Sequence, residues 1–289
     1  MFEGAYTAVI TPFNADGGVD YECYQSLLER QIEGGIDGIV PVGTTGESPT
    51  LNVKEHLKVI EVTVETCKGR CKVIAGTGAN ATEEAKELTM RGKEMGIDGS
   101  LQVTPYYNKP NQEGLYRHFS EVAEIGVPVV LYNVPGRSGR EIAIDTIVRL
   151  ANHPNVAAVK EAGGSVDRVS QIFNACEIEV LSGDDGLTLP MMSVGATGVI
   201  SVAANVAPAP VVQMVHYALD GQWSEALVLH RKYYQLFCDF FIDTNPVPVK
   251  AGMAMMGLIQ ELYRLPLCSM TEAQKEILAN SLKAVGLLR

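Results

Sequence analysis

The strongest constraint on the fold is a pattern that recurs along most of the 289-residue chain: a short apolar run, a turn rich in Gly, Thr, Pro or Asn, and an amphipathic stretch. Near-continuous apolar runs are typical of parallel strands that helices cover on their outer face. Eight such runs fit a (β/α)8 TIM barrel better than an open doubly wound sheet. The expected strands are Ala5–Ile10, Gly38–Val42, Val73–Ala75, Leu101–Val103, Val127–Tyr132, Val156–Lys160, Val180–Ser182 and Gly198–Val202.

Helical periodicity fills the intervals between these runs. Two helices carry a start signal: Asp20 precedes the first, and Thr82 is followed by Glu84 and Glu87. Beyond residue 223 the strands stop, so we expect a catalytic barrel over residues 1–223 and a C-terminal helical appendage over 224–289. The expected helices are Tyr21–Gly34, Val53–Cys67, Thr82–Met95, Gly114–Ile125, Ile144–Ala151, Ser165–Ala175, Trp223–Phe241, Pro248–Leu262 and Thr271–Leu287.

Composition excludes several classes of function. The formal net charge is -11 with no basic cluster, so the electrostatic footprint of a nucleic-acid-binding protein is missing. No run of 18 apolar residues and no signal peptide is present, which argues against a membrane protein. None of the six cysteines forms a C-x-x-C pair and no Cys/His spacing resembles a zinc site, which predicts free thiols in a reducing, cytoplasmic compartment. The cysteines are Cys23, Cys67, Cys71, Cys176, Cys238 and Cys268.

Lys160 is the most unusual residue of the expected barrel, because it ends the apolar run Val156–Lys160. Burial of an ammonium is costly and favours the neutral amine, which can attack a carbonyl and form a Schiff base. The alternative is that Lys160 reaches solvent or pairs with the adjacent Glu161. Active sites of (β/α)8 barrels lie directly after the strands, which favours the catalytic interpretation.

The other strands also end in polar residues. Hydroxyl groups and one arginine, Arg137, are expected at the same rim as the lysine. The planar guanidinium of an arginine can bind a carboxylate through two hydrogen bonds. This combination favours carbonyl chemistry on small anions. The segments are Thr11–Phe13, Gly43–Ser48, Gly76–Asn80, Thr104–Asn108, Tyr132–Arg137, Lys160–Ala162, Gly183–Asp185 and Ser201.

Two further motifs at the strand ends could suggest a dinucleotide cofactor or a metal, but neither motif is specific enough to predict one. Gly76, Gly78 and Ala81 match a loose dinucleotide fingerprint, but a strand–helix passage often carries glycines as tight turns. The pair Asp184 and Asp185 has no third ligand at usable spacing. We therefore expect a reaction that needs neither.

Together these motifs resemble the dihydrodipicolinate synthases, within the class I aldolase and lyase family that includes N-acetylneuraminate lyase. The resemblance covers nearly the whole chain, and the order and spacing of its motifs make it specific. They are Ile10–Phe13, Gly43–Ser48, Val73–Asn80, Val103–Asn108, Leu131–Gly139, Val159–Ala162, Leu181–Asp185, Gly198–Val202 and Asn245–Lys250.

The resemblance implies condensation of pyruvate with aspartate 4-semialdehyde, a step on the diaminopimelate route to lysine. Lys160 would form the imine with pyruvate, and Tyr132 would act as general acid and base. Thr45 would link Tyr132 by hydrogen bonds to Tyr107, which a neighbouring subunit contributes in the family's oligomer, a homotetramer built as a dimer of dimers. The remaining positions implied to bind substrate are Thr44 and Thr45 for the pyruvate carboxylate, Arg137 for the semialdehyde carboxylate, and the backbone of Gly183 and Ile200.

The resemblance also implies feedback inhibition by L-lysine in a cleft between subunits. Val53 and Pro49 depart from the pattern of lysine-sensitive members, which predicts weakened inhibition. The alternative is that His56 and Glu84 are ordinary helix-surface residues. The positions that match the lysine site are Ser48, His56, Asn80, Glu84 and Tyr106.

Two other functions compete with this one. Sialic acid lyases and related aldolases of 2-keto-3-deoxy sugar acids share the lysine, the tyrosine and the threonine loop, but the family pattern implies that they lack Arg137 and the Tyr106–Tyr107 pair. A non-catalytic sensor would be expected to lose Lys160 or Tyr132, and both are present. The sequence therefore favours the synthase.

Overall fold

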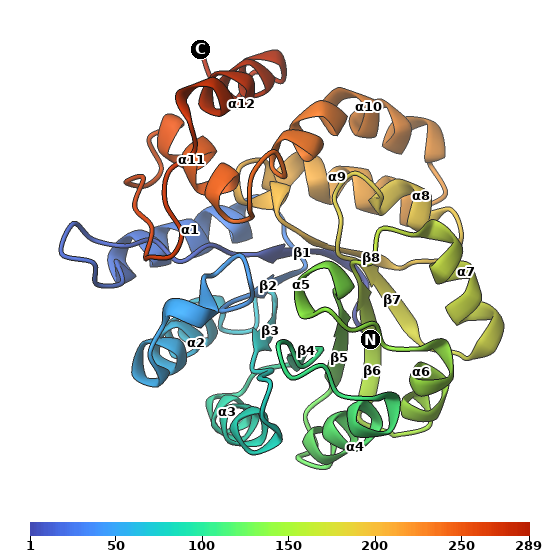
Figure 1. Cartoon of the computed structure of the whole chain (residues 1–289). Helices are drawn as coiled ribbons and strands as arrows, with labels where there is room; N and C mark the ends of the chain where they lie inside the picture. Colours follow the sequence, from blue (N-terminus) through green and yellow to red (C-terminus); the bar gives the residue numbers. More distant parts are fainter.

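The computed structural model describes residues 1–289 and consists of a closed barrel of eight parallel strands, in the order β1 to β8, with helices around it (Figure 1). Strand β8 pairs with β1 and closes the barrel. The predicted (β/α)8 fold is thus confirmed. The strands are β1 (Gly4–Ala8), β2 (Gly38–Val40), β3 (Lys72–Gly76), β4 (Gly99–Val103), β5 (Val129–Asn133), β6 (Val156–Glu161), β7 (Glu179–Ser182) and β8 (Gly198–Ser201).

Most helices follow the predicted bounds closely. Asp20 caps the first helix, where its carboxylate accepts a hydrogen bond from the Cys23 amide. The helices up to the last strand are α1 (Tyr21–Glu33), α2 (Val53–Cys67), α3 (Thr82–Met95), α4 (Gln112–Ala123), α5 (Pro135–Ser138), α6 (Ile144–Ala151), α7 (Val166–Ala175) and α8 (Thr188–Met192), with a short 3-10 turn, η1 (Ser48–Thr50).

The predicted cap at Thr82 is wrong. Ala81 occupies the cap position of α3 and supplies no side-chain bond. The Thr82 hydroxyl instead contacts Nδ1 of His118 at 3.0 Å. A tertiary contact with α4 has therefore taken the group that would have capped the helix.

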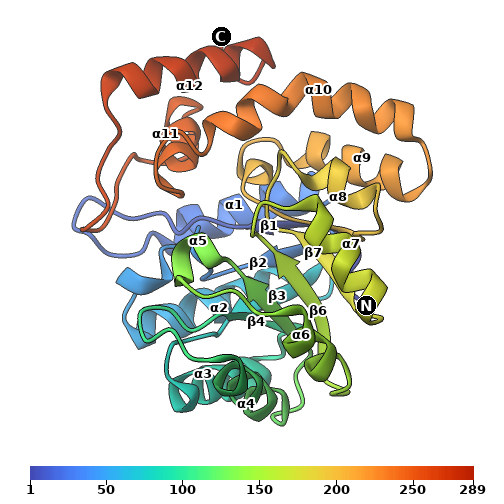
Figure 2. The ribbon, with the colours of Figure 1, turned by 45° about the vertical axis from the view of Figure 1, so that its right-hand side comes forward.

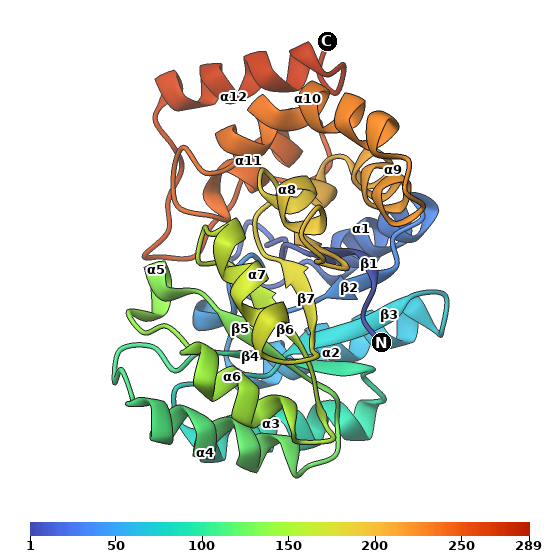
Figure 3. The same ribbon diagram turned by 90° about the vertical axis from the view of Figure 1, so that its right-hand side faces the viewer.

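The C-terminal residues form helices on one side of the barrel, as Figures 2 and 3 show from two directions. Helix α10 packs along α9 and α12, and α11 packs against α12. The predicted helix over Pro248–Leu262 is shorter than expected, because it ends at Met255 and Gly257 follows at φ +73°. These elements are η2 (Ala203–Asn205), α9 (Pro208–Leu219), α10 (Trp223–Asp239), α11 (Val247–Met255) and α12 (Glu272–Ala284).

The two faces of the barrel sheet pack against two separate apolar cores. One lies between the strands and the helices, and a smaller one fills the barrel with side chains such as Tyr6, Ile74 and Leu181. Because side chains alternate between the faces of a strand, Lys160 points to the same side as Ala158 of the inner core, whereas Glu161 points outward. No helix has the length and apolarity needed to cross a membrane.

Candidate active site

A cavity of about 460 Å³ opens at the carboxyl ends of the strands, where a (β/α)8 barrel carries its active site. Four of the predicted residues meet in its wall together with the backbone of Gly183. The C-terminal segment between α10 and α11 closes one side of the cavity. The lining residues are Thr45, Tyr132, Val134, Gly136, Arg137, Lys160, Ala162, Gly183, Asp184, Val202, Phe241, Thr244 and Asn245.

Lys160 is a buried amine without a partner. Its side chain is 6% exposed, and the protein provides Nζ with no hydrogen bond or ion pair. The ring centroid of Tyr132, on the paired strand, lies 4.4 Å from Nζ. Burial lowers the pKa of Lys160, although Tyr132 and the buried Asp185 oppose part of this effect. The site thus favours the neutral, nucleophilic form of the amine.

Glycine at position 183 leaves the space that Lys160 needs. A Cβ added there would lie 2.6 Å from Cβ of Ala162 and 3.0 Å from Cε of Lys160. Any larger residue would therefore clash with Ala162 and crowd the end of the Lys160 side chain. The other backbone position implied for this pocket, Ile200, is fully buried in the inner core, and Val202, two residues further along the chain, lines the cavity.

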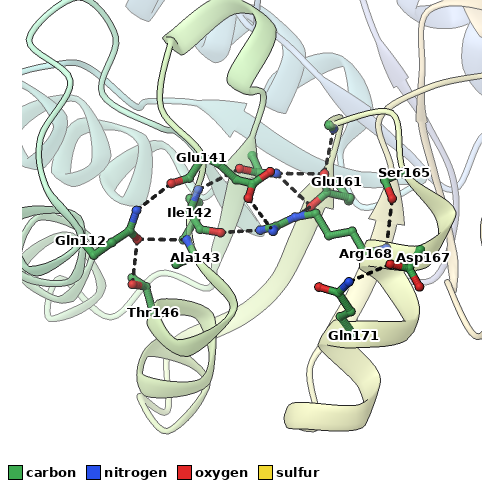
Figure 4. A network of polar contacts seen from close by, with 12 residues as sticks. Gln112, Glu141, Ile142, Ala143, Thr146, Glu161, Ser165, Asp167, Arg168 and Gln171 are labelled. Atoms are coloured by element: carbon green, nitrogen blue, oxygen red, sulfur yellow. Dashed lines mark hydrogen bonds and ion pairs between the residues drawn. The ribbon is translucent and has the colours of Figure 1, made fainter.

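Glu161 does not pair with Lys160. Its carboxylate is fully buried outside the barrel, where it accepts bonds from Arg168 Nε at 2.9 Å and from Asn133 Nδ2 at 2.9 and 3.0 Å. Figure 4 shows this network, in which Arg168 also meets Glu141 at 3.0 Å. The pairing of Lys160 with Glu161 that the sequence left open is therefore wrong, and the network fixes the end of β6 that carries the lysine.

The two neighbouring threonines face different cavities. Thr45 is buried in the Lys160 cavity, where its Oγ1 accepts a hydrogen bond from Asn245 Nδ2 at 3.0 Å. Thr44 lines a second, adjacent cavity of about 210 Å³. Tyr132, Val134 and Arg137 form part of the wall of both cavities.

A fully buried ion pair holds the threonine loop. Lys250 Nζ on α11 donates to Glu47 Oε1 at 2.5 Å and to the Thr11 carbonyl at 3.1 Å. Neither side chain of the pair is exposed, and the backbone N–H of Arg264 donates to the other oxygen of Glu47 at 3.4 Å. Glu47 lies only two residues beyond Thr45 and has a left-handed φ of 54°. The C-terminal helices therefore fix the conformation of this loop.

Arg137 lies at the mouth of both cavities. It belongs to α5, and its Nη2 donates to the Asn245 carbonyl at 3.1 Å. The residue is exposed, and this is the only hydrogen bond that the protein provides for its guanidinium. Most of its donors are thus free to bind a carboxylate at the entrance.

Tyr107 lies outside both cavities of its own chain. It is 90% exposed and has a left-handed φ of 71°. Tyr106, by contrast, lines the second cavity. Within one polypeptide, hydrogen bonds therefore do not link Tyr132 to Tyr107. A link of this kind would need the Tyr107 of a neighbouring subunit.

The residues implied for lysine binding are only partly brought together. Ser48 and Tyr106 line the second cavity, and Asn80 donates to the Tyr106 carbonyl at 3.2 Å. Burial and then the charge of Glu84, which is exposed nearby, raise the pKa of Tyr106. His56 is buried instead, with its Nε2 2.9 Å from the Gly76 carbonyl, and burial lowers its pKa.

The glycines of the loose dinucleotide motif are explained by packing. A Cβ at Gly76 would lie 2.4 Å from the Val42 carbonyl oxygen, and one at Gly78 would lie 2.4 Å from the Val103 amide nitrogen. No group of three His, Cys, Asp or Glu residues is placed to hold a metal.

Sequence reasoning missed one cavity residue with several contacts, Asn245. Its side-chain amide donates a hydrogen bond to Thr45, and its carbonyl accepts one from Arg137. Its Oδ1 is buried without a hydrogen-bond partner. The only sequence signal was its place at the start of the Asn245–Lys250 motif. No periodicity could have placed it beside the threonine loop.

Comparison with known proteins agrees with this geometry. The model of the dihydrodipicolinate synthetase family matches residues 1–285. A 4-hydroxy-tetrahydrodipicolinate synthase of Methanococcus maripaludis is 50% identical over 289 residues, which cover 99% of this chain and 100% of the relative.

Two solved structures extend the comparison. The chloride-inhibited dihydrodipicolinate synthase of Acinetobacter baumannii, complexed with pyruvate, matches with a TM-score of 0.98, 44% identity and complete coverage of both chains. DHDPS from Cyanidioschyzon merolae, solved with lysine bound, matches with a TM-score of 0.96, 40% identity and 99% coverage of each chain. The chain therefore belongs to the dihydrodipicolinate synthetase family.

Proposed function

We propose that this chain is a lyase that condenses pyruvate with L-aspartate 4-semialdehyde to give 4-hydroxy-tetrahydrodipicolinate, on the diaminopimelate route to lysine. The observation that carries the proposal is the unpaired, buried amine of Lys160 beside Tyr132, in a cavity whose mouth holds the free guanidinium of Arg137. The names of the relatives support the same reaction.

The chemistry begins at Lys160. Its neutral amine attacks C2 of pyruvate, and the carbinolamine loses water to form an imine. Protonation of the departing hydroxyl and removal of a proton from the pyruvate methyl group, which gives the enamine, need an acid and base within reach. Tyr132 is suited to this role because it lies beside the lysine and lines both cavities. The enamine carbon then attacks the aldehyde of the second substrate, whose oxygen takes up a proton and becomes the hydroxyl group of the product. The amino group of the semialdehyde attacks the imine carbon and displaces the amine of Lys160, which closes the ring and frees the lysine.

We assign the two threonines different roles, which revises the expectation that Thr45 carries the proton relay. Asn245 donates to Oγ1 of Thr45, so the Thr45 hydroxyl hydrogen is free to bind the pyruvate carboxylate in the Lys160 cavity. Thr44 shares the second cavity with Tyr132 and is better placed to relay protons to a Tyr107 from a second copy of the chain. The exposure of Tyr107 supports this intermolecular contribution.

Arg137 would bind the carboxylate of the semialdehyde, because its guanidinium stands at the entrance with most of its donors unused. The alternative function, cleavage of a 2-keto-3-deoxy sugar acid or of N-acetylneuraminate, is less favoured. The arginine and the names of the relatives both argue for the synthase.

We further propose a cytoplasmic homotetramer, a dimer of dimers, that L-lysine inhibits weakly. Six free cysteines support a reducing compartment. The lysine-bound relative supports the effector site, as do Ser48 and Tyr106 in the wall of the second cavity and the hydrogen bond from Asn80 to the Tyr106 carbonyl. Because Val53 and Pro49 depart from the lysine-sensitive pattern, and His56 is bonded to the Gly76 carbonyl, we expect weaker inhibition than in lysine-sensitive members. The boundary between the barrel and the C-terminal unit at residues 223 and 224 is also a proposal.

The test is a comparison of substrates. The full-length protein is incubated with pyruvate and aspartate 4-semialdehyde in one series and with N-acetylneuraminate in the other, and product formation is followed without added cofactor. We expect turnover only in the first series, and Arg137→Ala should weaken it. Turnover of the sugar acid alone would refute the synthase assignment.

A further inference from the structure

Two cysteines lie in contact at the end of the barrel opposite the candidate active site. Cys67 is the last residue of α2, and Cys71 directly precedes β3. Their sulfur atoms are 3.5 Å apart. Lys68 and Gly69 turn the chain between them with φ of 41° and 75°, and the amide of Arg70 donates to the Cys67 carbonyl at 2.8 Å.

No other pair of cysteines has this arrangement. The sulfurs of Cys23 and Cys176 each contact a backbone carbonyl, and Cys238 and Cys268 are exposed. All six cysteines are free thiols in this structure. Only Cys67 and Cys71 therefore have a second sulfur within reach.

The environment of the pair favours reaction at Cys71. Cys67 is 1% exposed, whereas Cys71 is only partly buried and is accessible to a small reagent. The hydrogen bond between the two thiols lowers the pKa of Cys71, burial opposes this effect, and the neighbouring Arg70 guanidinium lowers the pKa further. A thiolate is the attacking species in disulfide exchange.

We propose that Cys67 and Cys71 are a modification site. The two residues form a reversible disulfide with each other by exchange with a low-molecular-weight disulfide such as oxidised glutathione. The Cys71 thiolate attacks one sulfur of the reagent, forms a mixed disulfide and releases one thiolate. Cys67 then loses its proton and attacks Sγ of Cys71, which forms the protein disulfide and releases the second thiol. Two protein thiols are oxidised, and one reagent disulfide is reduced to two thiols.

The new bond would join α2 to β3 at the end remote from the site. At the rim, the contact between His56 and the Gly76 carbonyl already joins the same helix and strand. The sulfurs must approach by only about 1.5 Å to reach the bonding distance of a disulfide. We therefore expect the bond to stabilise this helix–strand unit and to leave the cavity unchanged.

The experiment uses the full-length chain with Cys238→Ser and Cys268→Ser, which removes the exposed thiols that would link molecules together. The protein is equilibrated in glutathione buffers of increasing oxidation, quenched with acid, alkylated and mapped by mass spectrometry. The matched controls are Cys67→Ser and Cys71→Ser in the same background. Thermal unfolding of the oxidised and reduced proteins is then compared.

We expect loss of the Cys67 and Cys71 thiols together, with a peptide about 2 Da lighter that joins both residues, and reversal by reduced glutathione. Cys67→Ser should leave a glutathione adduct on Cys71 that is never resolved. The oxidised protein should unfold at a higher temperature than the reduced one. Persistence of both free thiols, or a stable glutathione adduct on Cys71 in the presence of Cys67, would overturn the proposal. An unchanged unfolding temperature would overturn the stabilising role of the bond.

Discussion

Replacement of Lys250 with Met should strongly destabilise the protein. The Lys250 ammonium is 2.5 Å from Glu47 Oε1 and 3.1 Å from the Thr11 carbonyl, and neither Lys250 nor Glu47 is exposed. The substitution would leave the Glu47 carboxylate buried with only the weak 3.4 Å bond from the Arg264 amide. Breaking a buried pair by removing one partner typically costs about 3–5 kcal/mol, a large part of a total stability of about 5–15 kcal/mol.

The assay is urea unfolding at one fixed protein concentration, because association would otherwise change the apparent stability. The set contains the wild type, Lys250→Met, Glu47→Gln and the double variant. We expect the double variant to be more stable than Lys250→Met, since the amide introduced by Glu47→Gln carries no charge that needs a partner. The Thr11 carbonyl loses its bond in both, so it does not account for the difference.

Two results would refute this account of the loop. One is a loss of less than about 1 kcal/mol in Lys250→Met, which would mean that water or another group compensates the Glu47 charge. The other is a double variant whose loss equals the sum of the single losses, because residues in contact are expected to couple.

Three further predictions concern Asn245, Arg137 and His118. Asn245→Ala removes the donor to Thr45 and should raise the KM for pyruvate about 2- to 10-fold, the value of one hydrogen bond; an unchanged KM in a pyruvate titration would contradict its role. Arg137→Ala should raise the KM for the semialdehyde about 10-fold or more while adduct formation with pyruvate persists; equal loss of both would contradict the assignment. Burial lowers the pKa of His118 from 6.5 to about 4, so between these two pH values the unfolded chain binds a proton that the folded protein does not, and the urea midpoint should fall as the pH drops from 6.5 to 4. His118→Gln should flatten this fall, and a variant with the same pH profile as the wild type would contradict the role of His118.

The sequence predicted the barrel because buried parallel strands and their turns leave a strong local pattern. The same pattern placed Lys160 at the rim, since a strand end determines where its last side chain lies. Helix α9 was not identified, because apolar residues such as Val211, Val212, Met214 and Val215 occupy most of its faces and hide a helical period. Thr82 failed as a cap because the prediction considered only its own helix, whereas His118 on α4 binds its hydroxyl.

The parts of the site that the sequence did not predict depend on contacts between distant segments. Asn245 and Thr45 are 200 residues apart, and no local propensity reports such a contact. The same holds for Lys250 and Glu47, which are 203 residues apart. The division between Thr44 and Thr45 is equally hidden, because adjacent residues of one loop are distinguished only by the cavities that they face. The three-dimensional arrangement was needed to assign them.

The central claim is that Lys160 forms an imine with pyruvate. The most direct measurement is reduction of the protein with borohydride in the presence of pyruvate, followed by peptide mass spectrometry. We predict one reduced pyruvyl adduct, located on Lys160, with none on Lys250, which is also buried but paired with Glu47. An unmodified Lys160, or an adduct located on another lysine, would contradict the account.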